Sequence, residues 1–188
     1  MDKQYWTTFY KNTAFSGPSY FAVSIQPRLA PGSTVIDLGC GEGRDCRYYR
    51  SLGFNVIGID QAVESRVVDR KLRFVQADLA DLDGFEVPKG VCFTARFLFQ
   101  SLSLEEERKL LGWVARQPRG TMLLIEGRAG RLPKYTFGSH YRRAVMQDAL
   151  VNRIHIEHDM RILQVVNGFW SPFMEENPLV YRIVARTR

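Results

Sequence analysis

The stretch that decides the fold is 33-STVIDLGCGEGRD-45. Its first half is an apolar, β-branched run that predicts a buried strand over residues 34–39. Its second half places three glycines within the five residues from Gly39 to Gly43, whereas a simple turn needs one glycine at most. Glycine lets the backbone approach another group closely. The stretch therefore predicts a ligand site directly after the strand, with Asp37 just before it.

Apolar strand patterns alternate with helical patterns along the rest of the chain. Further strands are predicted at 55–60, 72–78, 91–97 and 121–127, followed by two late strands at 159–166 and 178–186. Helices are predicted from about Gly43 to Leu52, over 101–117 with Ser103 as N-cap, and from His140 or Tyr141 to about Asn152. The connection 61–71 has room for about two or three helical turns. The predicted fold class is α/β: a parallel sheet with helices on both faces and an antiparallel edge hairpin.

Composition favours one soluble domain spanning residues 1–188. Hydrophobic residues make up 45% of the chain and charged residues 24%, which is typical of globular proteins. We interpret the aromatic segment 1–30 as a helical lid. The N-terminus lacks the apolar run of a signal peptide, and no stretch approaches the roughly 20 apolar residues of a membrane span. We therefore expect a cytoplasmic protein with no membrane partner. Three cysteines without a CxxC pair indicate reduced thiols and no metal site.

Three carboxylates end three successive strands, where ligands of such sheets bind. Asp37 can accept a hydrogen bond from an ammonium group, Asp60 from two ribose hydroxyls, and Asp78 from an adenine amino group. S-adenosylmethionine presents all three groups. Taken singly, Asp60 could instead cap a helix and Asp78 could stabilise a turn. Their joint occurrence at the right strands favours the cofactor.

Two other ligands of glycine-rich turns fit less well. A phosphate-binding P-loop is excluded, because no Lys-Ser or Lys-Thr follows the glycines. A nicotinamide site would place an acidic residue about 20 positions after the first glycine, and Asp60 meets that condition. A dehydrogenase also needs a substrate domain, however, and 188 residues leave little room for one.

The segments 35-VIDLGCGEGRD-45, 56-VIGID-60 and 76-QADL-79 resemble the first three motifs of class I SAM-dependent methyltransferases. The resemblance covers almost the whole chain and implies a Rossmann-like, seven-stranded sheet. It also implies S-adenosylmethionine as cofactor, S-adenosylhomocysteine as product, and no metal. The implied cofactor-binding residues are Tyr10, Asp37, Gly39, Cys40, Gly41, Arg44, Asp60, Gln61, Ala77, Asp78, Leu79 and Arg96.

A narrower resemblance points to the acceptor. The segments 9-FY-10, 43-GRD-45, 95-ARF-97, 125-IEGR-128, 140-HYRR-143 and 168-GFWSPFMEENP-178 are similar to small bacterial phosphonate and phosphate O-methyltransferases. They are also similar to the methyltransferase half of the O-antigen chain-terminating kinase–methyltransferase, an enzyme of polysaccharide biosynthesis. One departure is Gln100, where relatives often carry histidine. The implied acceptor is a small anion.

Basic residues gather after the fifth predicted strand, above the expected site. Guanidinium groups bind oxyanions in bidentate fashion, so Arg128 and Arg142 are predicted to clamp an anionic acceptor, with Lys134 and His140 assisting. Tyr10 and Tyr141 complete the predicted substrate site. We predict Arg128 and His140 as the catalytic residues, with His140 acting as base if the acceptor carries a proton. The net charge of +6 suits an anionic ligand, although a solvated basic face is an alternative.

The sequence thus predicts a SAM-dependent O-methyltransferase acting on a phosphonate or phosphate oxygen or a phosphate-bearing glycan end. One alternative is methylation of a neutral small-molecule hydroxyl or of RNA. Nucleic acid is disfavoured because 95-ARFLFQ-100 stands where an NPPY-type motif would be expected, and no RNA-binding domain is appended. Another alternative is a non-catalytic SAM-binding subunit of a biosynthetic complex.

Overall fold

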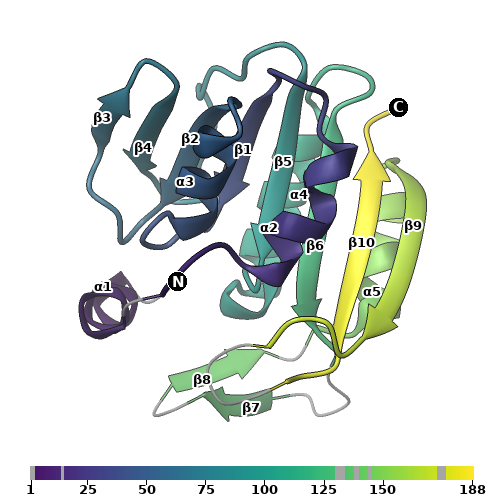
Figure 1. Cartoon of the computed structure of the whole chain (residues 1–188). Helices are drawn as coiled ribbons and strands as arrows, with labels where there is room; N and C mark the ends of the chain where they lie inside the picture. Colours follow the sequence, from purple (N-terminus) through teal and green to yellow (C-terminus); the bar gives the residue numbers. More distant parts are fainter. Residues whose placement is uncertain (1–2, 14, 130–133, 138–139, 144, 173–176) are drawn as a thin grey trace.

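The computed structural model describes residues 3–13, 15–129, 134–137, 140–143, 145–172 and 177–188, without the side chains of 134–137 and 140–143. A mixed eight-stranded sheet in the order β3-β4-β2-β1-β5-β6-β10-β9 runs through the molecule (Figure 1). Its central strands are parallel: β4 (Leu72–Gln76), β2 (Asn55–Asp60), β1 (Thr34–Leu38), β5 (Val91–Arg96) and β6 (Met122–Arg128). The antiparallel β10 (Val180–Arg186) and β9 (Arg161–Gly168) close one edge, as predicted.

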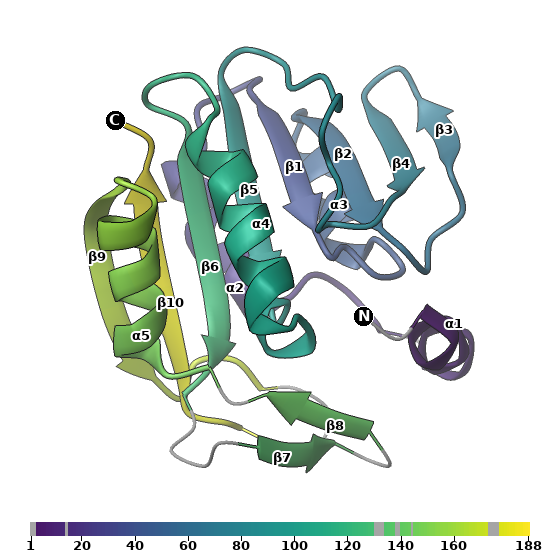
Figure 2. The same ribbon diagram turned by 180° about the vertical axis from the view of Figure 1, so that it is seen from behind.

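Helices cover both faces of the sheet. On one face lie α2 (Tyr20–Ile25) and α3 (Arg44–Ser51) (Figure 1), and on the other lie α4 (Leu104–Ala115) and α5 (Gln147–Asn152) (Figure 2). Because side chains alternate along a strand, Val35 packs with the α2–α3 core and Ile36 packs with the α4–α5 core. Short helical turns occur at Gln26–Arg28, Phe99–Ser101 and Arg153–Glu157. Among the described residues, no helix is both long and apolar enough to cross a bilayer.

The predicted helix at 101–117 begins at a well-defined cap. Ser103 Oγ accepts a hydrogen bond from the Glu106 amide at 3.2 Å, and Glu106 Oε2 accepts one from the Ser103 amide at 2.7 Å. This reciprocal arrangement satisfies two amides that the helix itself leaves unpaired. It confirms Ser103 as the N-cap of α4.

The predicted helical turns in 61–71 are wrong. This segment instead forms β3 (Arg66–Asp69), which pairs antiparallel with β4 as the eighth strand at the sheet edge. Asp69 Oδ1 accepts hydrogen bonds from the amides of Lys71 and Leu72, which closes a tight turn between the two strands. The β-branched Val67 and Val68 suit the extended backbone, and the short connection leaves little chain for a helical crossover.

The helix predicted from His140 to Asn152 is also wrong in its first half. Residues His140–Arg143 form β8, which pairs antiparallel with β7 (Lys134–Phe137), and α5 begins only at Gln147. The pairing places Thr136 opposite Tyr141, and both residue types favour strands. The β7–β8 hairpin lies beyond the carboxyl end of β6. The helix α1 (Lys3–Asn12) lies at the same end of the parallel strands (Figures 1 and 2).

Candidate functional site

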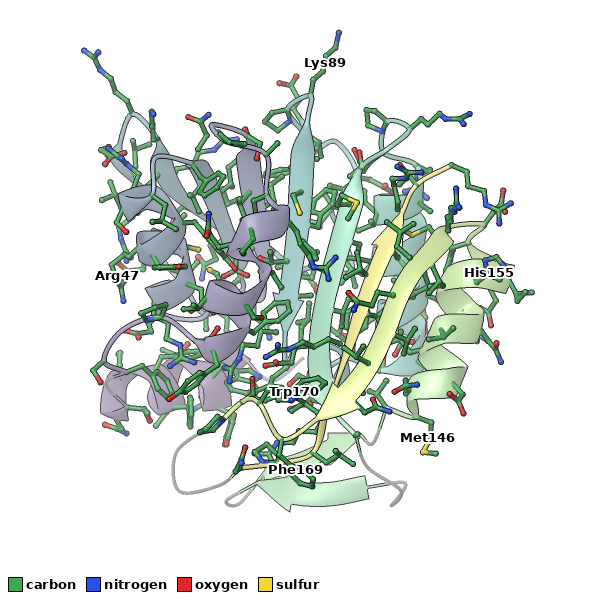
Figure 3. The ribbon with its side chains drawn as sticks, turned by 45° about the vertical axis from the view of Figure 1, so that its right-hand side comes forward. Arg47, Lys89, Met146, His155, Phe169 and Trp170 are labelled. Atoms are coloured by element: carbon green, nitrogen blue, oxygen red, sulfur yellow. The ribbon has the colours of Figure 1, made fainter. Side chains whose placement is uncertain are left out.

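A pocket opens at the carboxyl ends of the parallel strands, where the sheet order predicts a ligand. It is lined by the aromatic side chains of the N-terminal segment, by the glycine turn after β1, and by the ends of β2, β5 and β6. Its polar lining residues are Asp37, Glu42, Arg44, Asp45, Asp60, Arg96, Gln100, Ser101 and Arg128. Phe169 and Trp170 lie at this end of the molecule, and Lys89 marks the opposite end (Figure 3).

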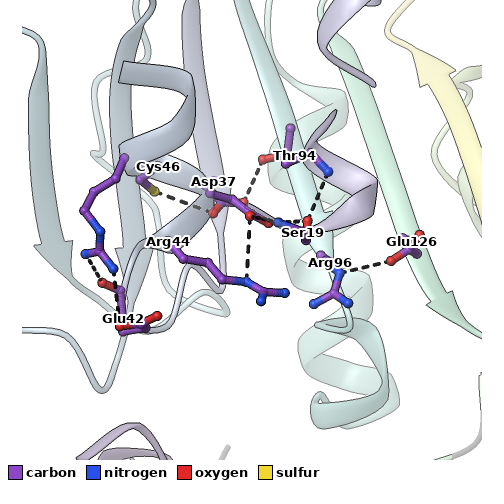
Figure 4. A network of polar contacts seen from close by, with 11 residues as sticks. Ser19, Asp37, Glu42, Arg44, Cys46, Thr94, Arg96 and Glu126 are labelled. Atoms are coloured by element: carbon purple, nitrogen blue, oxygen red, sulfur yellow. Dashed lines mark hydrogen bonds and ion pairs between the residues drawn. The ribbon is translucent and has the colours of Figure 1, made fainter. Parts of the chain in front are cut away.

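Asp37 lies at the buried end of β1 and is held by two neighbours. Thr94 Oγ1 donates a hydrogen bond to its Oδ1 at 2.7 Å, and Cys46 Sγ donates to its Oδ2 at 3.5 Å (Figure 4). Burial, and next the nearby charge of Asp45, raise the pKa of Asp37 to about 7, although the Thr94 hydrogen bond lowers it. Such a carboxylate gains strongly from a cationic ligand, which would offset its cost of desolvation.

Asp60 ends β2 and is oriented by the glycine turn. Its Oδ2 accepts a hydrogen bond from the Gly41 amide at 2.9 Å, and its Oδ1 accepts one from the Ala62 amide at 2.8 Å. Burial raises the pKa of Asp60, while these two amides lower it. Because each carboxylate oxygen can accept more than one hydrogen bond, Asp60 keeps acceptor capacity toward the pocket. The turn itself needs glycine, since Gly39 and Gly41 have φ of 71° and 55°.

The aromatic face of α1 covers the glycine turn. A Cβ atom placed on Gly41 would lie 2.4 Å from Cζ of Tyr10, so this glycine also makes room for the tyrosine ring. Trp6 stacks on Tyr10 with ring centroids 5.7 Å apart. Burial, and next the charge of Asp60, raise the pKa of the Tyr10 hydroxyl. The side chain of Tyr10 therefore borders any ligand that Asp60 holds.

Arginines stacked on aromatic rings line other parts of the pocket. The guanidinium carbon of Arg96 lies 4.2 Å from the Phe97 ring centroid, and that of Arg128 lies 5.7 Å from the same centroid. Arg96 Nε donates to Glu126 Oε1 at 3.0 Å (Figure 4). Burial lowers the pKa of Arg96, and the negative charge of Glu126 raises that pKa in part. Arg44 lies 4.6 Å over the Phe15 ring.

The structure brings together eight of the predicted site residues as lining of one pocket: Tyr10, Asp37, Gly39, Cys40, Arg44, Asp60, Arg96 and Arg128. Five predicted cofactor residues are not part of this lining: Gly41 lies within the glycine turn, where its amide bonds Asp60, and the other four lie elsewhere. Asp78 is exposed, and its Oδ1 accepts from the Ala80 amide at 2.9 Å, which is the turn role considered as its alternative. Leu79 is buried in the core, while Ala77 and Gln61 are half-buried beside Asp60.

Four predicted substrate residues, Lys134, His140, Tyr141 and Arg142, belong to the β7–β8 hairpin. The backbone of β8 packs against the Phe99–Ser101 turn, which contributes to the pocket wall. Their side chains lie outside the described part of the chain, so the roles predicted for them stay predictions.

Sequence reasoning missed several residues that shape the pocket. Thr94 and Cys46 hold Asp37, and Glu126 holds Arg96, but none was predicted to have a role. The signal for Glu126 was a charge inside the apolar run of β6, where a carboxylate needs a buried partner. The position of Phe97 had no sequence signal, because its φ of 52° is rare for a bulky residue.

The pocket retains polar atoms that a ligand could satisfy. Glu42 Oε1 and Ser101 Oγ are buried in its lining and have no hydrogen-bond partner among the described residues. Buried polar atoms of this kind are rare in proteins unless a ligand or water completes them. Within the same described residues, no group of three or more histidine, cysteine or acidic side chains is placed to hold a metal ion.

A family model described as a methyltransferase domain matches residues 10–156. No curated protein sequence matches the chain significantly. Among solved structures, a SAM-dependent methyltransferase from Methanosarcina mazei aligns with a TM-score of 0.71 at 15% identity, covering 87% of this chain and 96% of that chain.

Two further solved structures align over similar shares of the chain. A 1,6-didemethyltoxoflavin-N1-methyltransferase from Burkholderia thailandensis, with bound 1,6-didemethyltoxoflavin and S-adenosylhomocysteine, aligns with a TM-score of 0.67 at 16% identity over 89% of this chain and 76% of that one. The glycopeptide N-methyltransferase MtfA complexed with S-adenosylmethionine gives 0.70 at 13% identity, covering 94% and 90%. At such identities the likeness establishes the shared fold alone.

Proposed function

This chain belongs to the family of methyltransferase domains, and we propose that it transfers a methyl group from S-adenosylmethionine to an oxygen of a small anionic acceptor. The acceptor class is a phosphonate, a phosphate or a phosphate-bearing glycan end. The observation that carries the proposal is the division of charge in the pocket. Asp37 and Asp60 stand at the ends of β1 and β2, and Arg96 and Arg128 stand at the ends of β5 and β6.

The carboxylate side of the pocket suits the cofactor. Asp37 would accept a hydrogen bond from the cofactor ammonium, and that cation would favour the charged form of a carboxyl whose pKa is about 7. Asp60 would accept from the ribose hydroxyls, because its two amide bonds already fix its orientation. The buried Glu42 Oε1 is a further acceptor in the same lining.

The arginine side of the pocket suits an oxyanion. Arg96, which the resemblance assigned to the cofactor, and Arg128 both approach the Phe97 ring, so two guanidinium groups with planar donor forks face one small region. We therefore reassign Arg96 to the acceptor. An acceptor oxygen that is already ionised needs no general base, and the chain must then only hold it in line with the methyl group. Positioning of this kind can contribute about 7–11 kcal/mol to lowering the barrier. When bound, S-adenosylmethionine supplies the methyl group on an activated sulfonium.

Transfer of a labelled methyl group to an acceptor panel tests the proposal. The panel contains alkyl phosphonates, sugar phosphates, neutral sugars, phenols, primary amines and bulk RNA. We expect label on phosphonates or phosphates. Amines belong in the panel because two of the similar structures, the toxoflavin N1-methyltransferase and MtfA, are N-methyltransferases. Label confined to amines, neutral hydroxyls or RNA would contradict the anionic acceptor, and bound cofactor with no transfer to any acceptor would favour a non-catalytic subunit.

A further inference from the structure

Glu126 is a fully buried carboxylate that the mechanism above leaves without a role. It lies on β6, one strand from Arg96 on β5, with 0% of its surface exposed. Its Oε1 accepts from Arg96 Nε at 3.0 Å. Its Oε2 accepts from Arg182 Nε at 2.8 Å and from Ser171 Oγ at 2.6 Å. One carboxylate therefore joins the strands β5, β6 and β10 directly behind the pocket.

The contact with Glu126 determines how Arg96 meets the pocket. The carboxylate bonds Nε, the inner nitrogen of the guanidinium group, so the two terminal nitrogens lie farther along the side chain (Figure 4). Arg96 lines the pocket. Glu126 carries one negative charge and contacts two arginines, so the three side chains together keep a net positive charge. An anion entering the pocket would meet the terminal nitrogens of an Arg96 side chain whose rotation is already restricted.

The backbone after Arg96 is held by the same residue. The Phe97 amide donates to the Glu126 carbonyl oxygen at 2.8 Å, and Phe97 adopts a φ of 52°. Bulky residues persist in this conformation only where the surroundings enforce it, and such positions cluster at functional sites. The result places the Phe97 ring beneath the Arg96 guanidinium at 4.2 Å. Side chain and backbone of Glu126 thus act on the same pair of neighbours.

We propose that Glu126 is a positioning residue that fixes Arg96 as the group that binds the oxyanion of the acceptor. The inference rests on the proposed function, because it concerns the acceptor half of the same pocket. Arginine side chains have many rotamers, and restricting them before binding lowers the entropic cost of binding. Arg182 and Ser171 support the carboxylate from the side away from Arg96.

The test measures two affinities separately by calorimetry. The first is for S-adenosylhomocysteine, and the second is for methylphosphonate added to the S-adenosylhomocysteine-loaded protein. Glu126→Gln removes a negative charge beside Arg96, so weaker attraction of an anion cannot explain a loss of affinity. We expect methylphosphonate affinity to fall about tenfold or more, because Arg96 loses its charge-assisted anchor. We expect S-adenosylhomocysteine affinity to stay within about twofold, since the cofactor carboxylates are untouched.

Glu107→Gln is the matched control. Glu107 is also 0% exposed and is paired with an arginine, Arg153, but it lies on α4 outside the pocket lining. We expect it to leave both affinities unchanged. If Glu126→Gln fails to fold, Ser171→Ala removes only one donor from Oε2, and a selective loss of methylphosphonate affinity of a few-fold is expected.

Three outcomes would overturn the inference. One is unchanged or tighter methylphosphonate binding in folded Glu126→Gln, or unchanged binding in Ser171→Ala if that variant has to stand in. Another is a parallel loss of both affinities, which a merely structural role would produce. The third is the same selective loss in Glu107→Gln. Each leaves the proposed function standing as long as the wild type binds S-adenosylhomocysteine and methylphosphonate. A wild type that binds cofactor product but no methylphosphonate would instead overturn both the inference and the anionic acceptor, and failure to bind S-adenosylhomocysteine would contradict the methyltransferase itself.

Discussion

Asp37 combines a buried position with a role that requires negative charge. Its pKa of about 7 means that a large fraction of the ligand-free protein carries a neutral Asp37 at neutral pH. The first cause is burial, and the second is repulsion from Asp45, which is itself held by the amide and hydroxyl of Ser19 at 2.7 and 2.6 Å. A charged Asp37 therefore destabilises the fold because it is buried without a cationic partner. The same lack of a cation makes it a favourable binding group for a cationic ligand.

We expect affinity for S-adenosylmethionine to fall as the pH drops below about 7, because protonated Asp37 cannot attract the cofactor ammonium. Thr94→Val removes the hydrogen bond that stabilises the charged form, so the midpoint of this profile should move to higher pH. Calorimetric titrations between about pH 6 and pH 9 would measure it. Thr121→Val is the control, since Thr121 is buried but bonds Pro118 far from the pocket. An unshifted midpoint in Thr94→Val would contradict the assignment.

The same pKa has a consequence for folding stability. The native pKa of Asp37 lies above its ordinary value of 3.8, so between about pH 4 and pH 7 the native state binds a proton that the unfolded chain has released. Its contribution to stability is complete below about pH 4 and is lost as the pH rises through about 7. Asp37→Asn should raise the free energy of unfolding at pH 8 by on the order of a few kcal/mol while weakening cofactor binding. Urea denaturation of both proteins at pH 5 and pH 8 would check this, and a less stable variant at pH 8 would refute it.

At the scale of an element, α1 differs from the other helices. None of its residues is fully buried, yet it presents Trp6, Phe9 and Tyr10 to the pocket. Tyr10 is one of its residues that contact the rest of the protein, at Gly41 of the glycine turn. A helix with so little buried surface gains little stability from packing on the core, so its position depends on the pocket that it covers. This supports the interpretation of the N-terminal segment as a lid.

Tyr10→Ala should weaken binding of S-adenosylhomocysteine about tenfold and speed its dissociation, because the ring that closes over Gly41 is lost. Stopped-flow fluorescence would give both rate constants. Tyr20→Ala is a suitable control, since Tyr20 is 61% exposed on α2 and lies outside this pocket. Equal rate constants in Tyr10→Ala and the wild type would mean that α1 does not act as a lid.

At the scale of the whole molecule, the site joins segments that lie far apart in the chain, from Trp6 to Arg128. Residues of α1, of the β1 turn and of the ends of β2, β5 and β6 all line it. A ligand bound there should stabilise the entire fold. At a concentration of 100 times its Kd, S-adenosylhomocysteine should add about 2.7 kcal/mol and raise Tm by about 5–10 °C. Differential scanning fluorimetry would show this shift for S-adenosylhomocysteine and none for NAD; a larger shift with NAD would reverse the choice of cofactor.

Local pattern was sufficient to predict most of the fold. Strand runs such as 34–39 and the capping pattern at Ser103 depend on neighbouring residues, and the structure follows them. The two errors, at 61–71 and at 140–143, concern hairpins whose pairing depends on a partner strand. Short segments carry little helical or strand signal of their own, so the partner decides their form.

The sequence by itself determined the family and the order in which the central strands and their motifs follow one another along the chain. It also determined the acidic residues at the ends of β1 and β2, because glycine turns and strand-end carboxylates are local features. Only the tertiary structure decided which side chains share the pocket. It brought Tyr10 onto Gly41 and placed Glu126 behind Arg96. Those relations depend on the register of the strands and on burial in the folded chain. Both bring residues that are distant in the sequence into contact.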